Sequence, residues 1–311
     1  MSIIPYLRIA RFDHWFKNAF MLPGVILALY DSPDLWAGSL LFKIVLALLA
    51  AGLVASSNYI LNEVLDAPHD ALHPVKKHRP VPSGQIRLPW AYFGWIVFAL
   101  TGLGLAWTLG WEFFLANLAL WIMGCVYNIP PIRTKDKPYL DVLSESVNNP
   151  LRLLMGWYVV RADVLPPASL LAAYWMVGAF FMAVKRFGEY RRIANPDIAS
   201  QYRNSFNHYN EQKLLVSITY YAVAFGLFFG IFLLRYRVEL LLSIPFIAGF
   251  VGWYIHLGFL KDSPAQYPEK LYKQTGFMLY SLSCVGIMIA LLFIDIPIIG
   301  EWFQPTIRTQ D

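Results

Sequence analysis

The stretch LFKIVLALLAAGLVASSNYILNEVLDAPHD, residues 41–70, begins as an apolar run and ends in acidic and amide side chains. Its apolar part, Leu41–Asn62, has the roughly 20 residues that a helix needs to cross about 30 Å of hydrocarbon. Continued to Asp66, the helix would be about 39 Å long at ~1.5 Å per residue, so its last turns reach the membrane interface. An ionised carboxylate is tolerated there, whereas at mid-bilayer it costs about 3 kcal/mol. The stretch therefore predicts a transmembrane helix with a polar site at its end.

The whole chain has the same apolar character. Of its 311 residues, 58% are hydrophobic and 14% are charged, whereas a soluble domain has about 25% charged residues. In lipid, only helices and closed barrels satisfy every backbone polar group, and these apolar runs are too long and continuous for barrel strands. The sequence therefore predicts an all-α, polytopic membrane protein in one domain, residues 1–311, with nine transmembrane helices. The nine segments are Ala19–Tyr30, Leu41–Asn62, Trp90–Gly110, Phe113–Tyr127, Val142–Val160, Ala168–Val184, Leu214–Leu234, Leu240–Leu260 and Phe277–Ile299.

The distribution of lysine and arginine predicts the orientation. With the N-terminus in the cytoplasm, nineteen of these residues lie in cytoplasmic segments, five lie on the opposite side, and Arg152 lies within a helix. The asymmetry predicts an N-in/C-out protein of the cell (inner or plasma) membrane, with its active site facing the cytoplasm. The formal charge of +5 would suit a nucleic acid, but the basic residues lie in loops between apolar segments. The expected partners are therefore membrane lipids and not nucleic acid, and the sequence leaves a homo-oligomer open.

The polar end of residues 41–70 has the composition of a metal site. Asn58, Asn62 and Asp66 are four residues apart and share one helix face. Pro68 is expected to end or kink the helix, which lets Asp70 turn back toward Asp66. Mg²⁺ typically takes one or two carboxylates and bridges to substrate phosphates. A solvated helix end with scattered acids is the alternative. The predicted Mg²⁺ ligands are Asn62, Glu63, Asp66 and Asp70, and the predicted catalytic residues are Asn62, Asp66 and Asp70.

A basic loop follows the acids immediately. Its sequence is HPVKKHRPVPSG, residues 73–84. Lysine and arginine bind phosphate, and arginine can do so through two parallel hydrogen bonds. An ordinary loop of the positive cytoplasmic side is the alternative, but the proline and glycine spacing favours a structured loop. Lys76 and Arg79 are therefore predicted to bind phosphoryl groups.

These two motifs resemble those of the UbiA superfamily of membrane transferases. The pattern N-x-x-x-N-[D/E]-x-x-D-x-x-x-D runs from Asn58 to Asp70, and K-x-x-R-P-x-x-S-G runs from Lys76 to Gly84. In that superfamily the acidic motif binds Mg²⁺ and the diphosphate of the donor. The resemblance implies a UbiA-like helical bundle with the same use of these residues. Glu63 replaces the usual aspartate beside the second asparagine.

A third stretch resembles one branch of the superfamily. Aromatic prenyltransferases carry a second aspartate-rich motif after the sixth helix, whereas this chain has KRFGEYRR at 185–192, with the single acid Glu189. Together with WFKN at 15–18 and Arg152, this stretch resembles the decaprenyl-phosphate phosphoribosyltransferases. The resemblance implies Mg²⁺-dependent transfer of a 5-phosphoribosyl group from phosphoribosyl pyrophosphate to a polyprenyl phosphate, with release of pyrophosphate. A related pyrophosphoryl sugar stays open as the donor.

The remaining candidate residues follow from the needs of such a donor. A diphosphate and a further 5-phosphate need cations at two places, which Arg79, Lys185 and Arg186 could supply. Arg152 lies within an apolar segment, where ionisable residues are functional candidates, and a salt bridge to Glu145 is its alternative role. Snorkelling to the interface is the alternative for Lys17. The predicted substrate-binding residues are Lys17, Asn18, Asn58, Lys76, Arg79, Tyr127, Arg152, Lys185, Arg186 and Glu189.

Two other functions compete with this prediction. A prenyltransferase that moves an isoprenoid from a prenyl diphosphate to an aromatic or other acceptor would share the first motif, but the missing second aspartate cluster counts against it. A transporter of a phosphorylated solute is the more distant alternative. Transporters usually place the polar site near the midplane, on discontinuous helices, whereas the ionisable groups here gather at one predicted face.

Overall fold

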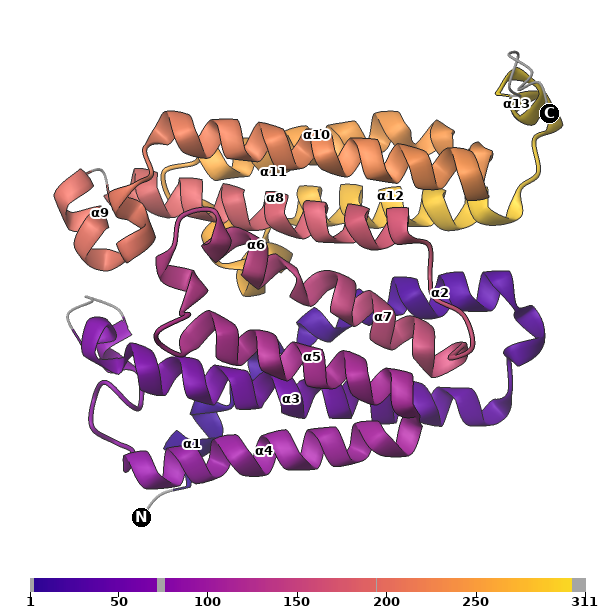
Figure 1. Cartoon of the computed structure of the whole chain (residues 1–311). Helices are drawn as coiled ribbons and strands as arrows, with labels where there is room; N and C mark the ends of the chain where they lie inside the picture. Colours follow the sequence, from indigo (N-terminus) through magenta and orange to yellow (C-terminus); the bar gives the residue numbers. More distant parts are fainter. Residues whose placement is uncertain (1–2, 72–75, 194, 304–311) are drawn as a thin grey trace. The chain divides into compact units, whose positions relative to one another are not determined.

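The structure of the protein, a computed structural model, describes residues 3–71, 76–193 and 195–303. Every regular element in those residues is a helix (Figure 1), which confirms the all-α prediction. The chain divides into two compact units. The first unit contains Met1–Pro166 and Ile193–Asn210, and the second contains Pro167–Arg192 and Glu211–Asp311. The start of the basic loop, residues 72–75 with His73, lies outside the described residues, and the single domain stays a prediction.

Six helices are long and apolar enough to cross a membrane, by length and composition. The three other predicted segments fold as shorter helices, α2 (Leu22–Asp31), α5 (Trp111–Asn128) and α7 (Asn148–Val160). At about 1.5 Å per residue, these are roughly 15, 27 and 20 Å long. The nine spans and the N-in/C-out orientation stay predictions. The six long helices are Gly38–Asp70, Leu88–Thr108, Ala168–Ile193, Glu211–Tyr236, Val238–Phe259 and Thr275–Phe293.

The first unit is built around α3 (Gly38–Asp70), which packs against α4 (Leu88–Leu109) and α5 (Figure 1). Its buried small residues, among them Ala47, Ala50 and Ala51, let neighbouring backbones approach closely. The Asn58 side-chain amide donates to the Leu120 carbonyl of α5 at 2.9 Å. Four residues further along α3, Asn62 donates to Asn128, which lies eight residues further along α5, so the two helices run in the same direction. Their polar C-terminal ends therefore lie together.

The contact between α2 and α7 depends on two glycines. A Cβ atom on Gly156 of α7 would overlap the main-chain carbonyl of Met21, and one on Gly24 of α2 would overlap the carbonyl of Leu153. Both obstacles are backbone atoms, which cannot move aside as a flexible side chain can. These glycines thus allow the two backbones to touch.

The surface of α4 is suited to lipid. Trp90, Phe93, Leu100 and Trp107 each expose more than half of their surface. Exposing such side chains to hydrocarbon costs no hydration free energy, whereas in water they would form a large exposed apolar patch. The six long apolar helices and this surface indicate an integral membrane protein.

The second unit contains α8 (Ala168–Ile193), α10 (Glu211–Tyr236), α11 (Ile244–Phe259) and α12 (Thr275–Phe293). Aromatic rings join its helices. Phe181 of α8 contacts Tyr254 of α11 at a ring-centroid distance of 4.8 Å, and Phe250 of α11 stacks on Phe277 of α12 at 5.2 Å. These contacts place the last turns of α8, which carry the basic stretch, on a packed helical support.

Candidate active site

The two candidate carboxylates lie one turn apart in the last turns of α3. The helix does not end at Pro68 but continues to Asp70. Of the two expectations for Pro68, a helix end there is therefore wrong, and a kink stays a prediction. Proline removes the hydrogen bond from its own nitrogen and crowds the carbonyl four residues earlier, but only two residues of the helix follow it here. Asp66 and Asp70 consequently share one helix face.

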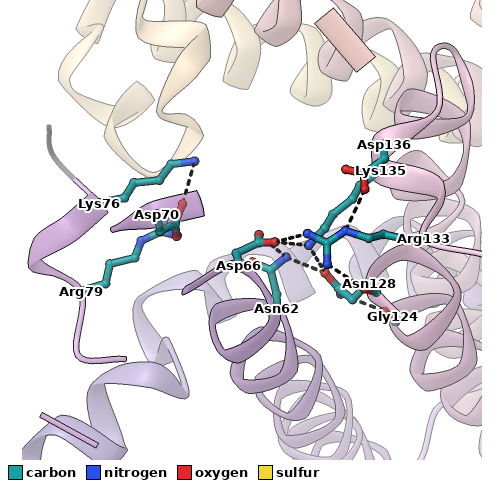
Figure 2. Close-up of polar contacts among 10 residues, drawn as sticks. All are labelled: Asn62, Asp66, Asp70, Lys76, Arg79, Gly124, Asn128, Arg133, Lys135 and Asp136. Atoms are coloured by element: carbon teal, nitrogen blue, oxygen red, sulfur yellow. Dashed lines mark hydrogen bonds and ion pairs between the residues drawn. The ribbon is translucent and has the colours of Figure 1, made fainter. Parts of the chain in front are cut away.

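Asp66 is surrounded by donors from two helices and a loop (Figure 2). The Asn62 side-chain amide donates to Asp66 Oδ2 at 3.1 Å, and Arg133 Nη2 donates to Oδ1 at 3.0 Å. Lys135 Nζ also donates to Oδ1. Arg133 and Lys135 come from the loop and the single 3-10 turn η4 (Thr134–Asp136) that follow α5. One carboxylate therefore pairs with two cations.

Asn128, at the C-terminal end of α5, orients this group. Its Oδ1 accepts hydrogen bonds from Asn62 Nδ2 at 2.7 Å and from Lys135 Nζ at 2.8 Å, while its own Nδ2 donates to the Gly124 carbonyl at 2.9 Å. The side chain is 2% exposed. A buried amide with three hydrogen bonds restricts the rotamers of its partners, so the Asn62 and Lys135 side chains are held in place.

Burial lowers the pKa of the Lys135 ammonium, and the adjacent Asp66 carboxylate acts in the opposite direction. The positive charges of Arg133 and Arg203 lower this pKa further. The carboxylate of Asp66 thus offsets part of the cost of burying the Lys135 ammonium.

Asp70 has a separate pair of cations, both from the basic loop (Figure 2). Arg79 Nη1 lies 2.6 Å from Asp70 Oδ2, and Lys76 Nζ lies 3.6 Å from Oδ1. The Lys76 ammonium also lies 4.7 Å from the centre of the Tyr202 ring. The structure thus brings together four residues predicted from the sequence, Asp66, Asp70, Lys76 and Arg79, as two carboxylate–cation groups on neighbouring turns.

Glu63 contacts the backbone of the basic loop. Its carboxylate accepts a hydrogen bond from the Val81 main-chain N–H at 3.2 Å, and the side chain is 3% exposed. It therefore holds the basic loop against α3 in this structure. Its role as a metal ligand stays a prediction.

Replacing Glu63 with glutamine separates these two roles. The amide oxygen can still accept from Val81, so we expect a loss of about 1–2 kcal/mol of stability and an unchanged Mg²⁺ concentration for half-maximal activity. Activity titrated with Mg²⁺ and a melting curve in detergent measure both quantities. A large rise in the Mg²⁺ requirement would instead make Glu63 a ligand.

The oxygen atoms around Asp66 and Asp70 fit Mg²⁺ by their chemistry. Within the described residues, no three His, Cys, Asp or Glu side chains gather as a metal-holding group. Mg²⁺ does not require such a group, because it is commonly bound through one or two carboxylates and retains several waters. Two carboxylates with the Asn62 amide beside them meet that requirement.

The other predicted residues of the first unit contact side chains or backbone within that unit. Asn18 Oδ1 accepts from Arg152 Nε at 3.3 Å, and both side chains are buried. Lys17 Nζ lies 5.7 Å from the centre of the Tyr59 ring. Asn58 packs on Gly124 of α5, and Tyr127 lies with its ring centre 5.9 Å from Lys135 Nζ. Asn18 and Arg152 thus join the segment before α2 to α7.

The predicted residues of the second unit lie in the last turns of α8. Arg186 Nη1 pairs with Glu189 Oε2 at 3.0 Å, and the Arg186 side chain is almost completely buried. Lys185 precedes it and is partly buried. The single acid of the basic stretch is therefore paired with an arginine of the same helix.

Sequence reasoning missed three residues of the Asp66 group, Asn128, Arg133 and Lys135. The sequence did contain a signal. An amide ends the apolar segment before two prolines, and two cations follow within seven residues of it. On the predicted topology, that loop and the acidic motif are on the same side of the membrane, so a search for partners of Asp66 could have included it.

Comparison with known proteins gives the family of the chain. The profile of the UbiA prenyltransferase family matches residues 18–293. The nodulation protein NoeC of Azorhizobium caulinodans is 28% identical over 234 residues, which are 72% of this chain and 71% of that protein. The decaprenyl-phosphate phosphoribosyltransferase of Mycolicibacterium smegmatis is 27% identical over 235 residues, 72% of this chain and 69% of the other.

The fold is also that of a solved structure. A UbiA homolog from Archaeoglobus fulgidus, determined with GPP and Mg²⁺, superposes with a TM-score of 0.69 at 21% identity, and the match covers 93% of this chain and 100% of that one. A family profile that matches most of the chain, with relatives that are transferases, favours an enzyme over a carrier. The chain belongs to the UbiA prenyltransferase family and is a membrane-embedded transferase.

Proposed function

We propose that this enzyme transfers a 5-phosphoribosyl group from phosphoribosyl pyrophosphate to a polyprenyl phosphate and releases pyrophosphate. The observation that carries this proposal is the basic stretch KRFGEYRR at the end of α8, where a prenyl-diphosphate enzyme of the aromatic branch would have a second acidic motif. Its one acid, Glu189, pairs with Arg186 at 3.0 Å. The similarity to the M. smegmatis phosphoribosyltransferase over 72% of the chain supports the same choice.

Asp66 and Asp70, with Asn62 beside them, would hold Mg²⁺. When bound, Mg²⁺ would neutralise the negative charge that grows on the departing pyrophosphate. The similar A. fulgidus homolog was determined with Mg²⁺, which supports a divalent ion as cofactor. Asn62 orients Asp66 by its 3.1 Å hydrogen bond.

The cations beside the carboxylates would bind the donor's phosphoryl oxygens. Lys76 and Arg79 lie next to Asp70, and Arg133 and Lys135 lie next to Asp66. In the reaction, the bond from ribose C1 to the pyrophosphate oxygen breaks, and its electron pair leaves with pyrophosphate. An oxygen of the polyprenyl phosphate supplies the pair for the new bond to C1. That oxygen is already anionic near neutral pH, so the site needs positioning and electrostatic stabilisation more than a general base.

The proposal also places the lipid acceptor relative to the helices and the membrane. The acceptor's lipid tail would lie against the apolar helices with its phosphate at the interface, and Arg152 with Asn18 would contact a phosphate of the acceptor or donor. The excess of Lys and Arg in one set of loops favours a cytoplasmic active site in the cell membrane. These placements are parts of the same proposal.

The test is a transfer assay with purified protein in detergent. Phosphoribosyl pyrophosphate labelled in its ribose is offered with Mg²⁺ and decaprenyl phosphate, and the lipid fraction is extracted and counted. We expect label in the lipid and an equal amount of pyrophosphate. Omitting Mg²⁺ or the acceptor should remove both signals.

The second candidate is transfer of an isoprenoid from a prenyl diphosphate, because the matching family is named for prenyltransferases and the A. fulgidus homolog was determined with GPP. The same protein is therefore offered labelled geranyl diphosphate and a set of aromatic acceptors. Turnover of geranyl diphosphate, with no label moving from phosphoribosyl pyrophosphate to lipid, would replace our proposal with this one.

A further inference from the structure

A fully buried carboxylate anchors a segment that no step above uses. Asp141, in the first turn of α6 (Leu140–Ser146), is 0% exposed. It accepts hydrogen bonds from the Tyr209 hydroxyl at 2.8 Å and from Ser205 Oγ at 3.2 Å. The Tyr209 hydroxyl in turn accepts from the Tyr139 main-chain N–H at 2.6 Å. Because a buried carboxylate without such partners is very costly, these bonds hold the segment 203–209 in one position.

The anchored segment begins with an arginine beside the buried carboxylate. Arg203 Nη1 lies 3.9 Å from Asp141 Oδ2. The 3-10 turn η5 (Asn204–Asn207), which follows Arg203, packs against η4, the turn that contains Lys135. The preceding residue, Tyr202, holds Lys76 beside Asp70. Two consecutive residues of one segment thus lie next to the two carboxylate–cation groups. Tyr202 does so through Lys76, and Arg203 does so through the contact of η5 with η4.

Cationic side chains gather in this region. Among the described residues, five cations and four carboxylates form its ion pairs, and Arg203 contributes a guanidinium beside the turn that contains Lys135. A guanidinium matches a phosphate with two parallel hydrogen bonds. The five cations are Lys76, Arg79, Arg133, Lys135 and Arg203, and the four carboxylates are Asp66, Asp70, Asp136 and Asp141.

We propose that Arg203 binds a phosphate monoester group of a substrate, and that Asp141 is the residue that positions Arg203 for this purpose. The inference rests on the proposed function, in which both the donor's 5-phosphate and the acceptor's phosphate are monoesters. Arg203 would distinguish such substrates from a prenyl diphosphate, which has a diphosphate alone.

Binding measurements test this inference without turnover. Wild-type protein and Arg203→Gln are titrated in detergent with Mg²⁺ against three probes: ribose 5-phosphate for the donor, farnesyl phosphate for the acceptor, and inorganic pyrophosphate. We expect Arg203→Gln to weaken one monoester about tenfold or more, with pyrophosphate little changed and Arg203→Lys in between. Lys137→Gln, which removes an exposed cation of the loop after α5, is the matched control and should bind all probes as the wild type does.

The probe that weakens identifies which substrate Arg203 binds. Failure of the wild type to bind either monoester, equal binding by Arg203→Gln, or an equal loss of pyrophosphate would each overturn the inference. If Arg203-dependent binding is found but the transfer assay shows no product, the proposed function fails and the phosphate site stands.

Asp141→Asn tests the positioning role. We expect it to weaken the same monoester as Arg203→Gln does, in addition to lowering the melting temperature. A lower melting temperature with unchanged binding of the monoester would reduce Asp141 to a structural residue.

Discussion

Replacing Asp66 with asparagine should lower the rate of transfer on the order of a hundredfold to a thousandfold, as expected when a group that stabilises the transition state is removed. The neutral amide cannot supply a negatively charged oxygen ligand at the end of α3. Asp70→Asn should have an effect of the same kind. Steady-state assays at saturating donor, with Mg²⁺ varied, measure the loss. Asp262→Asn, which changes an exposed carboxylate of the second unit, is the control and should keep wild-type activity.

Loss of Asp66 also leaves Lys135 buried beside a neutral partner. Removing one member of a buried pair costs about 3 kcal/mol or more, so Asp66→Asn alone could lose activity by unfolding. The double variant Asp66→Asn with Lys135→Gln removes both charges of this pair. We expect it to regain much of the melting temperature but no transfer. Recovery of activity together with stability would mean that Asp66 serves only to neutralise Lys135, and the metal proposal would then be wrong.

Replacing Gly156 with alanine should destabilise the first unit by about 1–3 kcal/mol or more, the usual cost of adding a methyl group where no space exists. The added Cβ would overlap the Met21 carbonyl, and relief requires α2 and α7 to move apart. The melting temperature in detergent, followed by circular dichroism, measures this effect. Because the segment before α2 carries Asn18, which bonds Arg152, we expect activity to fall as well.

Gly104→Ala is the matched control for this change. Gly104 lies within α4, and a Cβ there meets no other atom within 4 Å. Alanine is a better helix former than glycine by about 1 kcal/mol, so this variant should melt at or above the wild-type temperature. Equal melting of Gly156→Ala and Gly104→Ala would contradict the close contact between α2 and α7.

The helix class and the acidic end of α3 could be predicted from the sequence because both are local. Apolar length predicts a long helix, and a four-residue spacing predicts a shared face. Asp66 and Asp70 needed no knowledge of other segments. The same local argument wrongly placed a helix end at Pro68. Whether a proline ends a helix depends on how much of the helix follows it, and here α3 continues only to Asp70.

The partners of Asp66 could not be predicted in this way, because they lie far along the chain. Lys135 is 69 residues from Asp66, and Asn128 is 66 residues from Asn62. Their meeting depends on the register between α3 and α5, which is fixed where Asn58 packs on Gly124. Spacing along one helix contains no information about the register of another. The count of spans was limited for a related reason, since composition does not show that the apolar segment Val142–Val160 is interrupted at Val147, between α6 and α7.

The anchor at Asp141 has a consequence for the synthesis of the protein. Its hydrogen-bond partner Tyr209 is 68 residues further along the chain, beyond the whole of α8. At translation rates of about 5–20 residues per second, Asp141 leaves the ribosome roughly 3–14 seconds before Tyr209. During that interval α8 inserts while Asp141 still lacks its hydrogen bond from Tyr209, so the first unit is not yet fully formed around α6. A nascent chain stalled before residue 205 should therefore be more open to protease around α6 than one that has passed residue 209.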